Sequence, residues 1–141
     1  MRRVTLLGAT GSIGTSCLDV IAAHPDRLAA HALVAGKSWQ SLATACEKFR
    51  PRYAVLADPE IRGQIPANAF PSETTVLYGP EAVTQVAQDA DTDAVVSAIV
   101  GAAGLWGTWA AVEAGKRVCI ANKETLVVAG PLVMDLARRT G

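Results

Sequence analysis

Short apolar runs rich in Val, Ile, Leu and Ala recur along the chain, and more polar segments separate them. Runs of about four to eight such residues are typical of strands in a parallel sheet that is covered on both faces. We therefore predict six buried strands, over residues 4–8, 29–36, 53–57, 74–79, 93–101 and 117–122.

Most intervals between these runs carry apolar residues three or four positions apart, which is the spacing of one face of a helix. Pro131 can open the last helix, but it would kink a helix already begun at Lys123. Residues 58–73 break the alternation and predict a short helical turn followed by a proline-rich excursion. The pattern predicts helices over residues 12–23, 38–50, 80–90, 105–115 and 131–140.

The alternation of strand and helix predicts the fold class. Strands that are joined through helices pair in parallel by right-handed crossovers. We therefore expect an α/β fold with a doubly wound, mostly parallel sheet (Rossmann-like) and helices on both faces. The length suits one domain over residues 1–141, with enough interior for a real core.

The composition narrows the classes of function. The chain has 13 basic and 13 acidic residues and no dense basic block, which argues against nucleic-acid binding. No stretch approaches the ~20 apolar residues of a membrane helix, and the apolar part of the start, MRRVTLLG, is too short for a secretory signal. Cys17, Cys46 and Cys119 form no CxxC pair, so we expect reduced core thiols of a cytosolic protein, not a zinc site.

The segment GATGSIG is the first candidate for chemistry. It follows a predicted strand and opens a predicted helix, which is the context of a dinucleotide-binding turn. Gly11 lets a pyrophosphate approach the backbone, and Gly14 lets the helix pack tightly on the strand. The amides of Gly11, Ser12 and Ile13 suit an anion at the helix N-terminus, and the hydroxyls of Thr10 and Ser12 add donors.

An ordinary tight turn with Ser12 as the N-cap is the alternative. The glycine pattern is Gly-x-x-Gly-x-x-Gly, not the strict Gly-x-Gly-x-x-Gly. A side chain at Gly11 would block the pyrophosphate and, we expect, also strain the turn.

The end of the second predicted strand favours NADPH over NADH. NAD-binding domains usually hold the ribose hydroxyls with an acid about 20 residues after the glycines, and this chain has none there. It has Gly36, Lys37 and Ser38, so that a cation, a hydroxyl and a new helix N-terminus suit a 2′-phosphate. A solvated loop lysine is the alternative, and a Walker A loop is excluded because His31 occupies the position of its first glycine.

Asn122, Lys123 and Glu124 follow the sixth predicted strand. Parallel strands end at the same edge of a sheet, so these residues should lie on the edge that carries the glycine-rich turn, where a nicotinamide would reach. An amide, a cation and a carboxylate can line the mouth of such a site. The alternative is that Asn122 caps the following helix and Glu124 favours its first turn.

Five segments in this order carry a family resemblance: VTLLGATGSIGTSCLDVI, ALVAGKS, PRYAVLAD, SAIVGAAGLWGTWAAVEAGK and ANKETLV. Over nearly the whole chain they resemble the N-terminal domain of the 1-deoxy-D-xylulose 5-phosphate reductoisomerase family. The resemblance implies a bacterial or plastid enzyme of the non-mevalonate route to isoprenoids. Such an enzyme rearranges a sugar phosphate and reduces it with NADPH to 2-C-methyl-D-erythritol 4-phosphate.

The same resemblance implies roles for individual residues. Lys123 matches the family's substrate-contacting lysine, and Ser38 departs from the more frequent Asn. The family's acidic ligands for Mg²⁺ or Mn²⁺, its active-site loop and its C-terminal domain would follow this segment. We therefore expect no catalytic or metal-binding residue here, and an inactive NADPH-binding part of a cytoplasmic, homodimeric bacterial enzyme. The cofactor contacts fall on Thr10, Gly11, Ser12, Ile13, Gly36, Lys37, Ser38, Asn122 and Glu124.

Two alternatives remain at this point. An aspartate-semialdehyde dehydrogenase-like enzyme would share the turn, but it needs a catalytic Cys on a strand-end loop, and Cys119 lies inside a predicted strand. A non-catalytic nucleotide-sensing module explains the glycine-rich turn but gives no reason for Asn122-Lys123-Glu124.

Overall fold

The computed structural model describes residues 1–99, 104–121 and 123–141, apart from the side chain of Glu124. Within these residues, six parallel strands form one sheet in the order β4-β3-β2-β1-β5-β6. The predicted α/β class and parallel sheet are therefore confirmed. The strands are β1 (Arg2–Leu7), β2 (Leu28–Ala35), β3 (Tyr53–Leu56), β4 (Thr75–Tyr78), β5 (Ala94–Ser97) and β6 (Arg117–Ile120).

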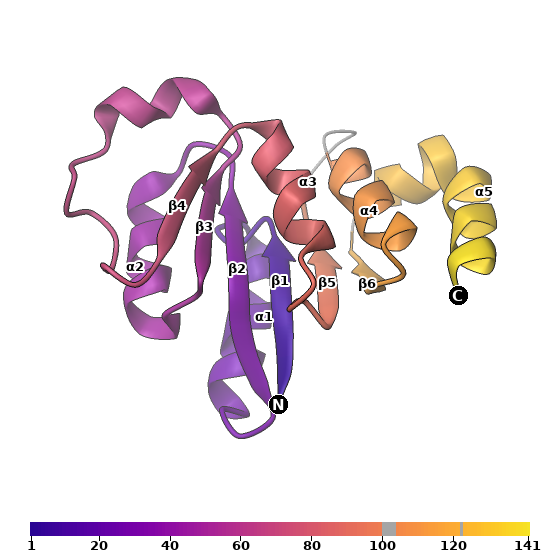
Figure 1. Cartoon of the computed structure of the whole chain (residues 1–141), viewed down its shortest axis with the longest axis horizontal. Coiled ribbons are helices and arrows are strands. Elements are labelled where there is room, and N and C mark those ends of the chain that lie inside the picture. Colours follow the sequence, from indigo (N-terminus) through magenta and orange to yellow (C-terminus); the bar gives the residue numbers. More distant parts are fainter. Residues whose placement is uncertain (100–103, 122) are drawn as a thin grey trace.

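Helices cover both faces of the sheet. The described α-helices are α1 (Ser12–Ala23), α2 (Trp39–Phe49), α3 (Pro80–Gln88), α4 (Gly104–Glu113) and α5 (Lys123–Thr140). Helices α1 and α2 pack on one face and α3 and α4 on the other, while α5 packs against α4 at the β6 side (Figure 1). The 3-10 helix η1 (Pro59–Gln64) lies where the sequence predicted a short helical turn.

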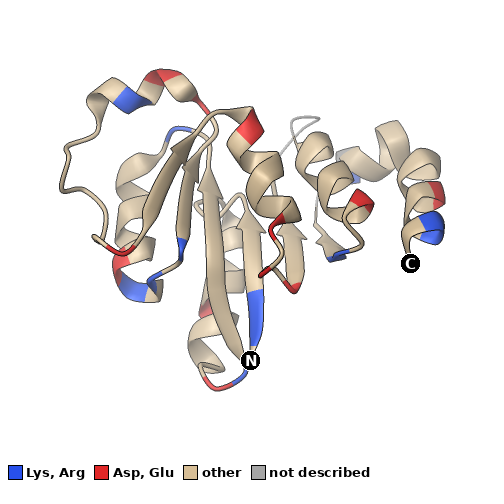
Figure 2. Ribbon diagram, viewed as in Figure 1, with Lys and Arg blue, Asp and Glu red and all other residues tan. Residues whose placement is uncertain are grey.

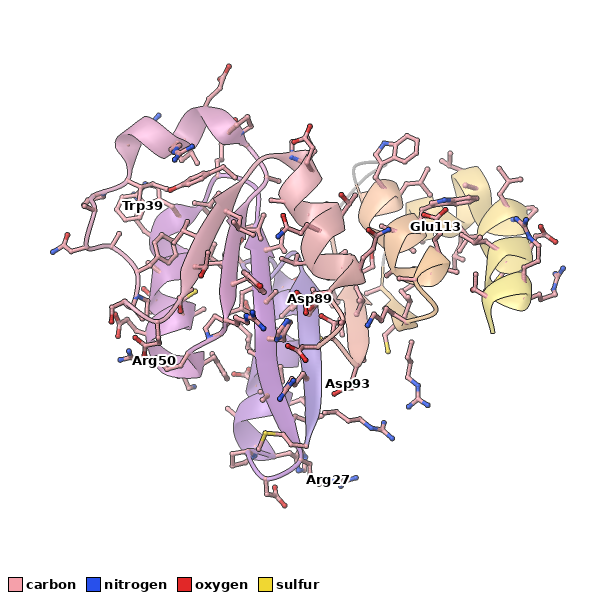
Figure 3. All side chains as sticks on the ribbon, in the orientation of Figure 1. Arg27, Trp39, Arg50, Asp89, Asp93 and Glu113 are labelled. Atoms are coloured by element: carbon pink, nitrogen blue, oxygen red, sulfur yellow. The ribbon has the colours of Figure 1, made fainter. Side chains whose placement is uncertain are left out.

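Adjacent residues of each central strand enter two separate cores. Leu6 and Leu33 belong to the cluster beneath α1 and α2, whereas Leu7 and Val34 belong to the cluster beneath α3 and α4. All four side chains are fully buried. Because successive side chains of a strand point to opposite faces, a strand buried on both faces needs an unbroken apolar run. This requirement explains why the strands stand out in the sequence, and Figure 3 shows side chains filling both sides of the sheet.

The order of the strands creates a crevice at one edge of the sheet. The chain winds outward from β1 to β4 and then returns to place β5 beside β1, with Val4 opposite Ala94 and Leu7 opposite Ser97. The segment after β1 leads to α1 on one face, and the segment after β5 leads to α4 on the other face. In open α/β sheets, such a switch point leaves room for a ligand beyond the carboxyl ends of the strands.

Helix α5 begins at Lys123 and is interrupted at Ala129, where φ is −137° and ψ is 19°. The interruption lies two residues before Pro131, whose ring clashes with the preceding helical turn, so the predicted kink is confirmed. The fifth strand is shorter than predicted. It ends at Ser97, and the last two positions of the predicted strand, 100 and 101, lie outside the described residues.

The structure corrects the expectation that all three cysteines are core residues. Cys46 is buried and Cys17 half-buried, but Cys119 is exposed. Val118 and Ile120 pack toward α4 and α5, so the side chain between them points to the other face of β6. Burial, together with the nearby charge of Glu47, raises the pKa of Cys46 to about 12, and burial also raises the pKa of Cys17. A raised pKa favours the thiol over the reactive thiolate at both positions.

The surface matches the balanced charge of the sequence. Acidic and basic positions interleave around the ribbon (Figure 2), and the residues drawn there form no dense basic block. In the part of the chain that the structure describes, no helix combines the length and the apolar character required to cross a membrane.

Candidate functional site

A cavity of about 480 Å³ lies at the carboxyl edge of the sheet, at the switch point between β1 and β5. Residues at or just after the carboxyl ends of β1, β2, β3 and β5 line this cavity, and residues of α3 and α4 complete its wall. Of the residues predicted to bind the cofactor, Thr10, Gly11 and Gly36 line it. The lining residues are Gly8, Thr10, Gly11, Ala35, Gly36, Ala57, Pro80, Val83, Thr84, Ala98, Ile99, Trp106 and Gly107.

Gly8 closes the base of the cavity where β1 meets β5. The Ala98 amide donates to the Leu7 carbonyl at 2.8 Å, which holds the two strand ends together. Gly8 has a φ of +93°, and a Cβ there would lie 2.6 Å from the Ala98 carbonyl oxygen. Only glycine fits this position, because both the backbone conformation and the space exclude a side chain.

Gly14 holds the first turn of α1 against the turn that precedes it. A Cβ at Gly14 would overlap the carbonyl oxygen of Gly8 and lie 2.8 Å from backbone atoms of Ala9. This contact is the tight approach of helix to strand that the sequence predicted for the third glycine of the motif. It aims the N-terminus of α1 at the cavity.

Gly11 differs from Gly8 and Gly14 because neither its backbone angles nor its described contacts require a glycine. It is the exposed N-cap of α1, with φ −80° and ψ 176°, and a Cβ would meet only the Gly8 carbonyl oxygen at 3.8 Å. The expectation that a side chain here strains the turn is therefore wrong, because the positive φ lies at Gly8. A side chain at Gly11 would instead occupy the space in front of the N-terminus of α1.

The N-terminus of α1 presents donors to that space. The first amides of an α-helix have no partner within the helix, and here the cap supplies no side-chain hydrogen bond and the first turn no acid. Ser12 and Ile13 are exposed, and Ile13 keeps 47% of its surface in water although it is apolar. The Thr15 hydroxyl instead donates to the Gly11 carbonyl at 2.8 Å. The Gly11 amide donates to the Gly8 carbonyl at 3.4 Å, so the following amides at the N-terminus, together with the helix dipole, favour an anion here.

A second helix N-terminus lies at the end of β2. Gly36 has open space around its Cα, Lys37 and Ser38 are exposed, and Ser38 is the N-cap of α2 without a side-chain hydrogen bond to that helix. The first turn of α2 contains no acid. The Asp58 amide donates to the Gly36 carbonyl at 3.0 Å, which fixes the end of β2 to the segment after β3. The Trp39 amide donates to the Lys37 carbonyl at 2.9 Å. A lysine, a hydroxyl and the N-terminus of α2 thus meet at one exposed corner.

The comparison with known proteins decides between the families that share such a turn. The family model described as 1-deoxy-D-xylulose 5-phosphate reductoisomerase matches residues 4–130. The chain belongs to this family. The reductoisomerase of Cupriavidus metallidurans is 51% identical over 143 residues, and that of Laribacter hongkongensis is 48% identical over 141. Each match covers 100% of this chain and 36% of the relative.

Solved reductoisomerases share the fold. The reductoisomerase from Zymomonas mobilis in complex with NADPH matches with a TM-score of 0.92 and 41% identity, over 99% of this chain and 37% of that one. A DOX-P reductoisomerase in complex with magnesium matches with a TM-score of 0.91 and 39% identity, over 100% of this chain and 36% of that one. The chain therefore spans about a third of the length of its reductoisomerase relatives.

The Asn-Lys-Glu segment of this reductoisomerase chain is described only in part. Asn122 and the side chain of Glu124 lie outside the described residues. Lys123 is exposed and begins α5, directly after the carboxyl end of β6. The lysine thus lies at the carboxyl edge of the sheet, as predicted. β5 separates β6, which precedes the lysine, from β1, which precedes the glycine-rich turn. Its role and those of its two neighbours stay predictions.

Sequence reasoning missed the apolar wall of the cavity. This wall comes from the residues after β3 and β5 and from the first turns of α3 and α4, and its largest member is Trp106. A signal was present, because the segment LWGTW puts two tryptophans three positions apart with a glycine between them. The sequence predicted a helix over this segment but no role for either tryptophan, and of the two only the partly buried Trp109 joins a core cluster of the described residues. The wall consists of Ala57, Pro80, Val83, Ile99 and Trp106.

The buried His31 pairs with the half-buried Asp89, which Figure 3 labels. The His31 ring nitrogen Nε2 lies 3.1 Å from Asp89 Oδ1, and the ring meets Tyr53 edge-to-face at 5.6 Å. Burial acts to raise the pKa of Asp89, but the Asp91 amide and the imidazole outweigh it, so the pKa is lowered. The pair fastens the α3–β5 connection to β2, and its role is structural.

Proposed function

We propose that this chain is the NADPH-binding domain, over residues 1–141, of a bacterial reductoisomerase. The longer enzyme converts 1-deoxy-D-xylulose 5-phosphate to 2-C-methyl-D-erythritol 4-phosphate by rearrangement and reduction, in the cytoplasm and as a homodimer. The observation that carries the proposal is the cavity at the switch point, which has the N-terminus of α1 on one side and the Gly36-Lys37-Ser38 corner on another. Family membership and an NADPH complex of a 41% identical relative support it.

The two helix N-termini have separate tasks in this proposal. The amides of Gly11, Ser12 and Ile13 hold the pyrophosphate, and the Thr10 hydroxyl at the cavity wall adds a donor. Lys37 and Ser38 hold the 2′-phosphate, with Gly36 leaving the backbone open beside them. NADPH, when bound, supplies the hydride for the reduction.

Asn122, Lys123 and Glu124 complete the site on the nicotinamide side. Asn122 and Glu124 position the cofactor and the local backbone, and Lys123 donates to the oxygen atoms of the sugar phosphate. We assign no metal ligand to this chain. Among the residues that the structure describes, no three His, Cys, Asp or Glu side chains gather in a way that could hold an ion. The magnesium that one relative's complex contains would be held by residues beyond this segment.

The first prediction concerns the choice of cofactor. Lys37→Ala should weaken NADPH binding about 10- to 100-fold, because the variant loses a charge-assisted contact of about 1.5–3 kcal/mol with the 2′-phosphate. NADH lacks this phosphate, so its affinity should barely change. Fluorescence titration with both cofactors measures the two effects.

Lys48→Ala is the matched control, since Lys48 is an exposed lysine at the other end of the same helix. It should leave both affinities unchanged. If Lys37→Ala weakened NADPH and NADH equally, the lysine would not contact the 2′-phosphate. If the unmodified chain bound neither cofactor, the proposed function would be wrong.

The second prediction assigns Lys123 to the substrate. In the longer enzyme, Lys123→Ala should lower kcat/KM for the sugar phosphate and leave the affinity for NADPH unchanged. The reason is that the side chain offers donors to an oxygen-rich substrate and lies apart from the two phosphate corners. Steady-state kinetics and NADPH titration of the same variant measure both. A variant that lost NADPH affinity but kept normal substrate kinetics would place the lysine on the cofactor.

This second prediction also separates the enzyme from a nucleotide-sensing module. A module that only senses nucleotides would bind NADPH through the glycine-rich turn, but replacing Lys123 would change no reaction. The aspartate-semialdehyde dehydrogenase-like alternative is set aside by the family match over residues 4–130.

A further inference from the structure

One wall of the cavity carries an aromatic side chain that neither the proposed pyrophosphate site nor the proposed 2′-phosphate site uses. Trp106, in the first turn of α4, lines the cavity opposite the glycine-rich turn, and 69% of its surface is exposed. The other two tryptophans are partly buried, Trp39 against the core beneath α1 and α2 and Trp109 against the core beside α5. Trp106 belongs to none of the core clusters of the described residues. Within the described residues, packing of the core therefore does not account for a tryptophan at this position.

The backbone that carries Trp106 is held firmly in place. A Cβ at Gly107 would lie 2.7 Å from Leu7 Cδ1 and 3.3 Å from Val83 Cγ1, so the glycine lets α4 approach β1 and α3 closely. The buried Thr108 hydroxyl lies 2.7 Å from Ser97 Oγ and 2.9 Å from the Gly104 carbonyl oxygen. These contacts fix the first turn of α4 to the end of β5, and the backbone of Trp106 is therefore held beside the cavity.

The side chains that line the cavity with Trp106 are mainly apolar. Pro80 and Val83 of α3 line the cavity with it, and so does Ala57 after β3. The polar side chain on this side is that of Thr84, whose hydroxyl donates at 2.8 Å to the Glu81 carbonyl within its own helix. A flat, weakly polar ring fits such surroundings, and an aromatic ring gains further from offset stacking on the indole.

We infer that Trp106 stacks on the adenine ring of the cofactor, and this inference rests on the proposed NADPH site. The choice of adenine over nicotinamide rests on the cavity, which Trp106 on the β5 side shares with residues that follow β2 and β3. Gly36 and Ala57 follow β2 and β3, and Lys37 also follows β2. The ribose that would carry the 2′-phosphate at Lys37 also carries the adenine, so the adenine belongs at this end of the cavity. The nicotinamide half extends the other way, across β5 toward Lys123.

Stacking reads the face of the base and not its edge, so Trp106 contributes affinity without selecting one purine from another. Trp106→Leu should weaken binding of adenosine 2′,5′-bisphosphate about tenfold, whereas Trp106→Phe should retain most of the affinity. Neither variant should lose stability, because the side chain is mainly exposed. Reduced nicotinamide mononucleotide should bind both variants as it binds the unmodified chain.

Fluorescence provides an independent readout. Binding of adenosine 2′,5′-bisphosphate should quench the tryptophan emission of the unmodified chain and of the Trp109→Phe control, but hardly that of Trp106→Phe. Unchanged bisphosphate affinity in Trp106→Leu would overturn the stacking and leave the NADPH site intact. An equal loss of affinity for the nicotinamide mononucleotide would overturn the adenine assignment. If the unmodified chain bound neither NADPH nor the bisphosphate, the proposed function would fail, and the stacking with it.

Discussion

A Gly11→Val variant of this chain is expected to fold normally and to lose measurable NADPH binding. The backbone of Gly11 is in an extended conformation that valine adopts, and a Cβ there has space, with the Gly8 carbonyl oxygen at 3.8 Å. The valine side chain would instead fill the space in front of the α1 amides, where the pyrophosphate must approach. The loss should exceed the effect of any single side-chain deletion at the site, because it excludes the ligand sterically.

Circular dichroism and calorimetric titration of the same sample separate the two parts of this prediction. Gly63→Val is the matched control, since Gly63 lies in η1 with nothing within 4 Å of an added Cβ and away from the cavity. It should bind NADPH as the unmodified chain does. Retained NADPH affinity in Gly11→Val would show that the cofactor does not approach this turn.

Gly14→Ala, three residues along the same turn, is expected to have the opposite effect. Its Cβ would overlap the backbone carbonyl of Gly8, which cannot move without displacing β1 from β5. We expect the free energy of unfolding to fall by about 3 kcal/mol or more, in the range of severe overpacking. Urea denaturation followed by circular dichroism measures the change.

Gly107→Ala provides the comparison for this second variant. The added methyl group would also make a short contact, but with the end of the Leu7 side chain, which can adjust. Its destabilisation should therefore be smaller than that of Gly14→Ala. Equal midpoints for Gly14→Ala and the unmodified chain would show that α1 does not pack on the turn as closely as described.

The fold was predictable because its signals are local. Each central strand is buried on both faces, so VTLLG and ALVA appear as mainly apolar runs, and each helix between the strands carries its own spacing. Pro131 likewise predicted the kink that the structure has at Ala129. The position of the cavity followed from the alternation alone, since parallel strands share one carboxyl edge.

Features that depend on contacts between distant segments were not predictable. The motif could not show that Gly8 has no space for a Cβ, because the carbonyl group that would clash with it belongs to Ala98, ninety residues later. Cys119 was wrongly placed in the core, since its exposure depends on which face of β6 the described helices cover. Trp106 was missed because helical spacing does not distinguish a tryptophan that packs in a core from one that lines a cavity.

The central claim is that this chain binds NADPH through a 2′-phosphate site at the end of β2. Isothermal titration of the unmodified chain with NADPH and with NADH tests it most directly. We predict that NADPH binds at least about tenfold more tightly, as one charge-assisted phosphate contact requires. Equal affinities, or tighter binding of NADH, would contradict the account.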